Sequence, residues 1–281
     1  MTRRSERSPA ENAELALLLE VAGTPKPGNV DRHRDLEDLH FEHFLAGAVG
    51  AAPGLRTAAA GGAVGDAFER AVDGMARQSA GNTQFGCLLL LSPLVRAAAR
   101  DDLSPDGATA VVESTTVDDA VAFYRAFEHV DVAVDDPPAE TPELDVRRGA
   151  DAESALRDRE LTLLDVMALS VPGDRNAVEW TTGFEDTFAA ASDILADDGP
   201  ATDRAARAFL DLLADRPDTL VATQHGEEVA TAVAERAAAV DGLAEAESLA
   251  AEFAEEGINP GTTADLTAAA LFVALERGLT V

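Results

Sequence analysis

Three short segments of the sequence hold residues that could bind an anionic ligand or transfer protons. In the first, residues 20–32, Lys26 stands between two prolines and is followed by Gly28 and Arg32. The prolines stiffen the backbone, and a glycine lets the chain turn closely past a ligand. The two cations and a helix start near Asp35 would suit phosphate. The alternative is an ordinary interhelical loop, but Lys26 is the only lysine in the chain, which favours a binding role.

The second segment, residues 79–86, lies at the entry to a long apolar run. The side chains of Asn82 and Thr83 could present hydrogen-bond donors to a ligand, and the free backbone amides of a helix start would point the same way. The alternative is a helix cap made by Asn82 or Thr83, with Gly86 packing closely against a neighbour.

The third segment, residues 257–266, contains Gly261 and places Asp265 in the first turn of the last predicted helix. Its functional interpretation is a Mg²⁺-binding carboxylate beside an anion-binding helix start. The alternative is capping, because Thr262 with an acid three residues later forms a cap pair. Residues 174–180 are a fourth, weaker candidate site, for which we favour the alternative of a helix N-terminus whose acids match the helix dipole.

The elements that must position these segments are helices. Apolar residues recur at helical spacing along most of the chain, whereas the nearest strand-like run is only three residues long, so we expect one all-α domain of about ten helices over residues 1–281. The non-periodic stretch 131–145 is expected to be a surface connection. The predicted helices cover residues 8–21, 35–49, 64–75, 85–99, 116–127, 152–170, 176–195, 203–214, 226–239, 243–255 and 263–277.

Composition excludes several classes of protein. The chain has 281 residues, with 22 basic and 52 acidic side chains, and its net charge of −30 repels nucleic acid and anionic membranes. A single cysteine excludes a disulfide framework. The longest apolar run, residues 87–95, is too short to span a bilayer, and no signal peptide is recognised. We therefore expect a cytoplasmic globule that binds neither nucleic acid nor membrane.

The acidic excess is also informative about habitat. Lysine is nearly absent and aromatic residues make up only 5% of the chain, a composition typical of proteins from salt-accumulating archaea. At molar salt the Debye length falls to about 3 Å, so most of the self-repulsion is screened. Most of the acids are therefore interpreted as a hydrated, halophilic surface.

Taken in order, the three segments resemble the motifs of the triphosphoribosyl-dephospho-CoA synthase family, helper enzymes of citrate lyase and malonate decarboxylase. The composition would make the chain a divergent, haloarchaeal-type member. The residues that carry the resemblance are Glu20-Val21, Thr24-Pro25-Lys26-Pro27-Gly28, Val30-Asp31, His33-Arg34-Asp35, Gly81-Asn82-Thr83, Pro260-Gly261 and Ala264-Asp265-Leu266.

The resemblance implies an all-α enzyme that uses ATP and 3′-dephospho-CoA. Such an enzyme breaks the bond between adenine and ribose C1′ of ATP and joins that carbon to the 2′-hydroxyl of dephospho-CoA. Substitution at C1′ passes through an oxocarbenium-like state, so carboxylates are expected near the sugar. By matching position, phosphate and substrate contacts fall on Lys26, Gly28, Arg32, Asn82, Thr83 and Gly261. Catalytic roles fall on Asp31, Asp35 and Asp265, with Mg²⁺ on Asp31 and Asp265, and the division of labour among the three aspartates stays open.

The chain departs from the family pattern at three places. Gln84-Phe85 stands where the family has His-Lys, Thr262-Thr263 replaces Gly-Ser, and Asn29 replaces leucine. The alternatives to the family reaction are therefore a ribosyl transferase with another acceptor, a hydrolase of a ribosyl N-glycosidic bond, and a non-catalytic nucleotide-binding module.

Overall fold

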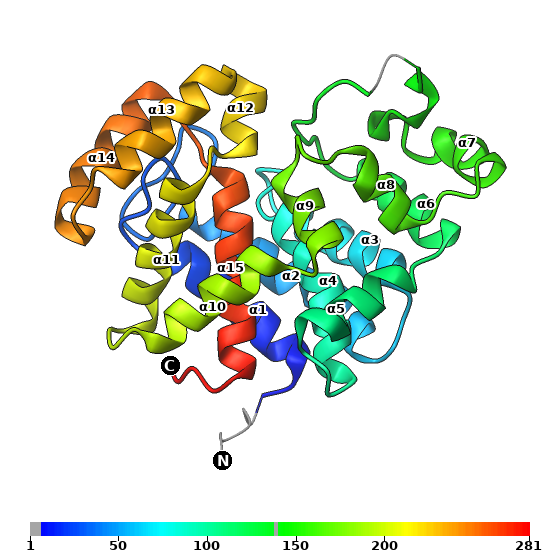
Figure 1. Cartoon of the computed structure of the whole chain (residues 1–281), viewed down its shortest axis with the longest axis horizontal. Helices are drawn as coiled ribbons and strands as arrows, with labels where there is room; N and C mark the ends of the chain where they lie inside the picture. Colours follow the sequence, from blue (N-terminus) through cyan, green and yellow to red (C-terminus); the bar gives the residue numbers. More distant parts are fainter. Residues whose placement is uncertain (1–6, 138–139) are drawn as a thin grey trace.

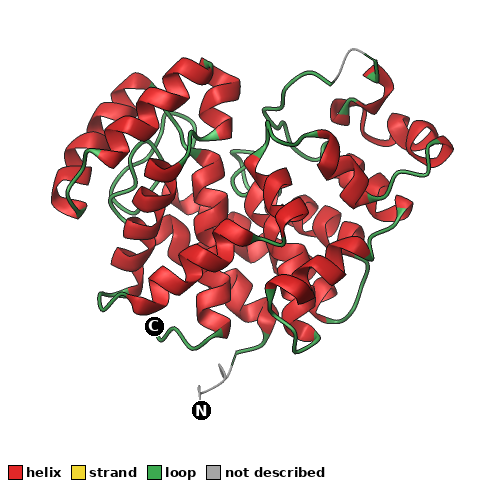
Figure 2. Ribbon diagram, in the orientation of Figure 1, coloured by secondary structure: helices red, strands yellow, loops and turns green. Residues whose placement is uncertain are grey.

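The chain folds into helices joined by loops and turns (Figure 2). The computed structural model describes residues 7–137 and 140–281, and these hold fifteen α-helices and two short 3₁₀ helices. Within the same ranges there is no strand, only an isolated bridge between Asp31 and Arg34. The predicted all-α class is confirmed.

From the N-terminus to the C-terminus, the helices have the following bounds. They are α1 (Pro9–Ala22), α2 (Phe41–Ala59), α3 (Val64–Met75), α4 (Phe85–Ala99), α5 (Pro105–Glu113), α6 (Val117–Ala126), η1 (Pro142–Leu144), η2 (Val146–Ala152), α7 (Glu153–Asp158), α8 (Leu163–Leu169), α9 (Arg175–Thr182), α10 (Glu185–Ala196), α11 (Ala201–Asp215), α12 (Thr219–His225), α13 (Glu227–Ala238), α14 (Leu243–Glu256) and α15 (Gly261–Glu276).

Local sequence signals place several of these helices. The Ser8 hydroxyl and the Glu11 carboxylate form a reciprocal capping box that begins α1, and Thr116 with Asp119 does the same for α6. Helices α3 and α4 have the predicted bounds. Because α4 is apolar on nearly every side, it is buried in the centre of the molecule.

Two predicted helices are broken in the structure. The helix expected over 152–170 is α7 and α8, because Glu160 between them adopts a left-handed φ of 54°. The helix expected over 176–195 is α9 and α10, because Gly183 at its middle has φ 73° and Phe184 follows with φ 63°. Apolar residues keep their helical spacing across both breaks, and for this reason the sequence predicted one long helix in each place where the structure has two.

The predicted helices differ from the structure in further places. Helix α5 was not predicted, although it contains the strand-like run; it begins where the Ser104 hydroxyl accepts a 3.0 Å hydrogen bond from the Gly107 amide. Helix α2 continues to Ala59, past its predicted end at residue 49. Helix α2 begins at Phe41 and not at residue 35, because the Asp35 carboxylate accepts a hydrogen bond from the Phe41 amide and caps the helix from outside. Helix α12 was not predicted; it begins where Asp218 accepts hydrogen bonds from the amides of Leu220 and Val221. The helix count is accordingly higher than about ten.

Helices α15 and α4 lie between two groups of helices (Figure 1). Helices α11 to α14 are on one side and share their own apolar cluster, which includes Phe209 and Phe253. Helices α6 to α8 are on the other side and join the main core. The loop between α6 and η1 and the loop between α8 and α9 face the first group, so the two sides can enclose a site. Among residues 7–137 and 140–281, no helix combines the length and apolarity that crossing a bilayer requires.

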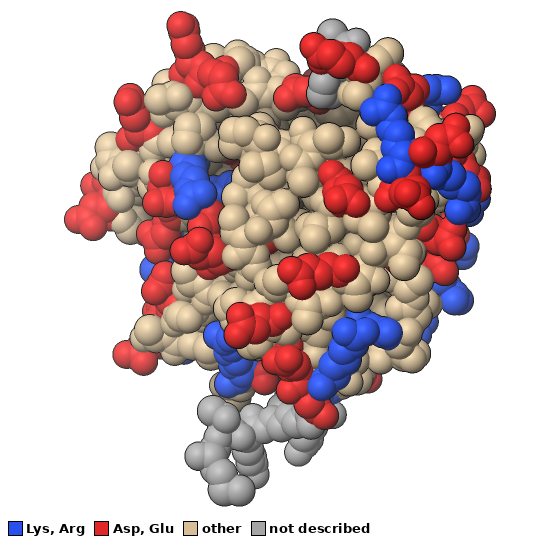
Figure 3. Space-filling view, turned by 45° about the vertical axis from the view of Figure 1, so that its right-hand side comes forward, with Lys and Arg blue, Asp and Glu red and all other residues tan. Residues whose placement is uncertain are grey.

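On the face shown in Figure 3, acidic and basic side chains lie next to each other at the right-hand edge and the bottom. Several arginines are held in ion pairs, among them Arg147 with Asp145 at 2.7 Å and Arg236 with Glu256 at 2.7 Å. Among the described residues, much of the positive charge is therefore paired with neighbouring acids.

Candidate functional site

A cavity of about 780 Å³ lies between the two groups of helices. Its wall is built from Glu20 near the end of α1, four residues of the loop that follows, the start of α4, the segment 131–137, the α8–α9 junction, and the starts of α12 and α15. One end is polar and the other is apolar. Its size falls within the range of small-molecule sites.

The described wall of this cavity is acidic. It contains no lysine, arginine or histidine, although a triphosphate would carry several negative charges into it. Phosphate groups bound at this wall would be repelled unless a cation balanced their charge. The carboxylates on the wall are Glu20, Asp131, Asp135, Asp136, Asp145, Asp174 and Asp265.

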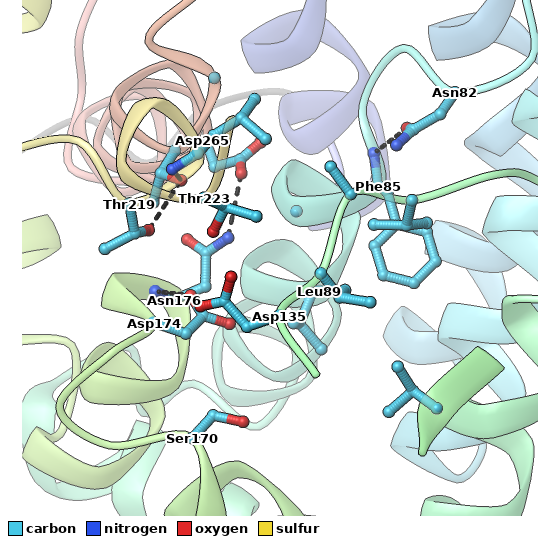
Figure 4. Close-up of a pocket in the computed structure, with 18 of the residues that line it drawn as sticks. Asn82, Phe85, Leu89, Asp135, Ser170, Asp174, Asn176, Thr219, Thr223 and Asp265 are labelled. Carbon is cyan, nitrogen blue, oxygen red and sulfur yellow. Dashed lines mark hydrogen bonds between the residues drawn. The ribbon is translucent and has the colours of Figure 1, made fainter. Parts of the chain in front are cut away.

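Asp265 lies at the polar end of the cavity, where two side chains hold its oxygens (Figure 4). Its Oδ2 accepts a hydrogen bond of 3.0 Å from Asn176 Nδ2, and its Oδ1 accepts one of 3.1 Å from Cys87 Sγ. Burial raises the pKa of Asp265 to about 7, and the charges of Asp218 and Glu20 act in the same direction. Asp265 can therefore take up and release a proton near neutral pH.

The Cys87 thiol acts only as a donor to Asp265. Burial raises its pKa well above the usual value, and the nearby Asp265 carboxylate raises it further. A thiol that stays protonated can hold a carboxylate oxygen but is a poor nucleophile.

Two close packings fix Asp265 in place. A side-chain carbon at Gly86 would lie 1.9 Å from Asp265 Oδ2, so only glycine lets α4 approach α15 this closely. Asp218 anchors the start of α15, because its Oδ2 accepts hydrogen bonds of 2.7 Å from both the amide and the hydroxyl of Thr263. Thr263, one of the two threonines that depart from the closing motif of the family, therefore helps to fix the start of α15.

Asn176 belongs to the weaker fourth candidate segment, 174–180, and was not among the predicted site residues. Its segment was interpreted as a helix start, and the Asp174 carboxylate does accept a 2.8 Å hydrogen bond from the Asn176 amide. The Asn176 side chain also lies on the cavity wall, is 7% exposed, and leaves Oδ1 without a partner in the described chain. No local signal could have shown this, because its partner Asp265 is 89 residues away.

Lys26 lies behind the wall and not on it. Its side chain is fully buried, forms an ion pair with Glu20, and donates a 3.1 Å hydrogen bond to Asn29 Oδ1. Glu20 and Asn29 do line the cavity. Burial raises the pKa of Glu20, and the charge of Lys26 opposes that rise. The only lysine thus compensates a wall carboxylate, whereas the sequence predicted direct contact with phosphate.

Four further predicted residues, Gly28, Asp31, Arg32 and Asp35, lie outside the cavity wall. Asp31 is buried, and its oxygens accept hydrogen bonds from the Thr24 hydroxyl at 2.9 Å and from the amide of His33 at 2.8 Å. Arg32 and Asp35 are exposed on the loop that follows. Asp265 lines the cavity and Asp31 does not, so the structure does not bring together the two aspartates predicted to share a Mg²⁺ ion. The described residues also hold no group of three or more side chains placed to bind a metal ion.

Gly28 has a structural reason to be glycine. Its φ is 78°, and a side-chain carbon there would lie 2.4 Å from the Ile258 carbonyl oxygen. The first and third motifs therefore pack directly against each other, and Asn29 Nδ2 donates a 3.0 Å hydrogen bond to Asn259 Oδ1 in the same contact.

Four predicted residues do meet at the cavity, namely Asn82, Thr83, Gly261 and Asp265. Asn82 caps α4, because its Oδ1 accepts a 3.1 Å hydrogen bond from the Phe85 amide, and its contact with a ligand stays a prediction. The Thr83 hydroxyl is buried without a partner in the described chain. Thus segments far apart in sequence form one wall.

Comparison with known proteins agrees with this arrangement. A crystal structure from Archaeoglobus fulgidus, provisionally assigned as a triphosphoribosyl-dephospho-CoA synthase, superposes with a TM-score of 0.69 at 26% identity and covers 83% of this chain and 99% of that chain. No curated protein sequence matches the chain. Residues 6–280 match the family described as ATP:dephospho-CoA triphosphoribosyl transferase, and the chain therefore belongs to that family.

Proposed function

We propose that this chain transfers the triphosphoribosyl group of ATP to the 2′-hydroxyl of 3′-dephospho-CoA and releases adenine, with the chemistry at the polar end of the cavity. The type of reaction is inferred from the family to which the chain belongs. The observation that carries the assignment to this site is Asp265, a carboxylate with a pKa of about 7 whose two oxygens are held by Asn176 and Cys87.

In this reaction the bond between ribose C1′ and adenine breaks while C1′ joins the acceptor oxygen. Asp265 in its charged form accepts the proton of the acceptor hydroxyl, which makes the oxygen a better nucleophile. Adenine leaves with the electron pair of the broken bond and takes a proton in turn. Because its pKa is near the pH of the reaction, Asp265 is suited to both receiving and returning a proton.

Glu20 is the second carboxylate proposed to act. It lies on the wall with Lys26 directly behind it, so its charge is partly compensated before substrate binds. A fixed anion near the sugar stabilises the positive charge that develops on C1′ and the ring oxygen. Asn176 keeps Asp265 oriented and has a free acceptor, Oδ1, for a sugar hydroxyl.

The polar end fits Mg²⁺ bound together with a triphosphate. Mg²⁺ is usually held by one or two protein carboxylates plus substrate phosphates. Asp174, beside Asn176, would supply such an oxygen and leaves Asp265 to accept a proton, and the described wall has no basic residue that could balance the phosphates instead. When bound, the ion would neutralise the phosphates. The protein residues supply its ligands and the proton acceptor.

The direct test is adenine release from ATP and Mg²⁺ in strong salt, with and without dephospho-CoA. Adenine that appears only with dephospho-CoA, together with a product of the combined mass, supports the transfer. Adenine in the absence of an acceptor indicates N-glycosidic hydrolysis. ATP binding without any adenine release would indicate a binding module and contradict the proposal.

A further inference from the structure

The cavity has an apolar end that the proposed chemistry does not use. Phe85, Phe123 and Phe127 lie on its wall, with ring centroids 4.8 Å apart for Phe85 and Phe127 and 5.2 Å apart for Phe123 and Phe127. At the cavity edge Leu169 and Val171 are 47% and 40% exposed. Large apolar side chains left exposed beside a cavity indicate a surface that a ligand covers.

A segment of unpaired main chain runs along the same cavity. Residues 131–137 all line it, and they form neither helix nor turn. Within the described chain, none of their amide or carbonyl groups makes a hydrogen bond with another main-chain or side-chain group. A row of free amides and carbonyls is a template for pairing with another peptide-like chain.

The charge of this segment restricts what can bind it. Asp131 and Asp135 have no ion-pair partner in the described chain, and Asp136 has Arg147 at 2.7 Å. No basic side chain lines the described wall. Away from the Mg²⁺ proposed at Asp174, no cation balances these carboxylates, so the part of a ligand at the apolar end should be uncharged.

We propose that this apolar end, together with the main chain of residues 131–137, holds the pantetheine arm of dephospho-CoA. The arm is an uncharged chain of methyl and methylene groups with two amides. Its amides pair with the free main chain, and its methyl groups contact Phe127, Leu169 and Val171. This inference depends on the proposed function, because it assigns a place to one substrate of that reaction.

The adenine of ATP is a poorer occupant. A single purine ring system is too short to pair along the seven residues 131–137, and the phenylalanine, leucine and valine side chains offer no directed partner of their own to the ring nitrogens and amino group. Tyr124 is no substitute as a donor, because its hydroxyl already donates a 2.7 Å hydrogen bond to the Leu144 carbonyl. Asp135 faces Asp174 and Asn176 (Figure 4), so an arm along the segment places the attached nucleotide toward Asp265.

The test compares binding of dephospho-CoA with binding of ADP, which has the same nucleotide without the arm, and of ATP. Titration calorimetry on the full chain should show dephospho-CoA binding about tenfold or more tightly than ADP. Leu169→Ser removes an apolar contact, and Ala133→Pro removes one main-chain donor. Each should weaken dephospho-CoA binding about five- to tenfold and leave ADP and ATP unchanged.

Ala133→Ser is the matched control, because it changes the same exposed position and keeps the amide. It should bind all three ligands as the unmodified chain does. Both Ala133 and Leu169 are exposed, and unchanged melting temperatures would show that the variants fold. Equal affinity for dephospho-CoA and ADP, or equal weakening of ATP, would overturn the inference.

The two proposals can fail separately. Arm-dependent binding without adenine release would contradict the proposed function and support the assignment of the apolar end. If adenine release requires dephospho-CoA but binding is insensitive to the arm and to both variants, the proposed function is supported and the assignment of the apolar end is contradicted.

Discussion

At the scale of single residues, the site depends on how donors and charges surround one carboxylate. Asp265 belongs to a motif that the sequence identifies, but its raised pKa comes from burial and from neighbours on other helices. Three residues can be changed to test that environment, namely Asp265, Asn176 and Lys26.

Asp265→Asn should lower the rate of adenine release by about 10²- to 10⁴-fold, the usual contribution of a positioned proton acceptor. In the unmodified chain the rate should rise with pH and level off above about 7, because only the charged carboxylate accepts a proton. The residual rate of the variant should not follow that titration. Rate measurements from pH 5 to 9 check both points.

The contribution of Asp265 to stability should fall with rising pH, whereas its contribution to the rate should rise. A carboxyl whose folded-state pKa is raised holds its proton more tightly in the folded chain, so its stabilising contribution is complete below about 4 and is lost as pH rises through about 7. Asp265→Asn should remove that loss between pH 4 and 7. An identical pH dependence of unfolding in both proteins would contradict the raised pKa.

Asn176→Ala should move the midpoint of the pH–rate profile to higher pH. The Asn176 amide favours the charged form of Asp265, so its removal raises the carboxyl pKa further. Asn82→Ala is the matched comparison, because Asn82 lines the same cavity and its side chain caps α4. A midpoint that moves equally in both variants would show that Asn176 has no specific effect.

Lys26→Met should destabilise the fold by about 3–5 kcal/mol, because it leaves Glu20 buried without its partner. Adding Glu20→Gln should recover much of that loss. Unfolding of the single and double variants by denaturant measures both effects. If Lys26→Met leaves stability unchanged and weakens ATP binding, the lysine contacts phosphate, as the sequence indicates.

At the scale of elements, the site exists because α4, α9 and α15 come together at their starts. The contact of α4 with α15 depends on Gly86, and the contact of α15 with α12 depends on Asp218. Helix α9 is a separate helix only because the chain breaks at Gly183. Each of these features lies between helices and not within one.

Gly86→Ala should therefore reduce activity about 10²-fold, since it must displace Asp265 from its donors. Gly173→Ala is a suitable control at the same cavity, because a side-chain carbon there would meet only the Ser170 carbonyl oxygen at 3.6 Å. Adenine release and circular dichroism of both variants separate a displaced site from an unfolded one. Equal activities would show that α4 can move aside.

At the scale of the whole molecule, a net charge of −30 is the dominant property. Self-repulsion destabilises a compact chain at low salt, and screening relieves it. We propose on this basis that the protein is adapted to strong salt.

The melting temperature should rise by several degrees or more between 0.1 and 2 M KCl, as screening shortens the Debye length from about 10 Å toward 3 Å. Sucrose of equal osmolality is the control, because it stabilises proteins without screening charge. A melting temperature that responds to sucrose and KCl alike would contradict the electrostatic explanation.

The fold class, the bounds of α3 and α4, the capping of α1 and α6, and the family all follow from the amino-acid sequence alone. Those features depend on residues close together or on ordered motifs, so they can be recognised before the chain folds. Packing of the helices selected which motif residues line the cavity: Asp265, Asn82, Thr83 and Gly261 do, and Lys26, Gly28, Asp31, Arg32 and Asp35 do not. Packing of the helices also placed Asn176 beside Asp265. The burial of Asp265, its raised pKa and its hydrogen bonds to distant residues arise only when the helices pack together.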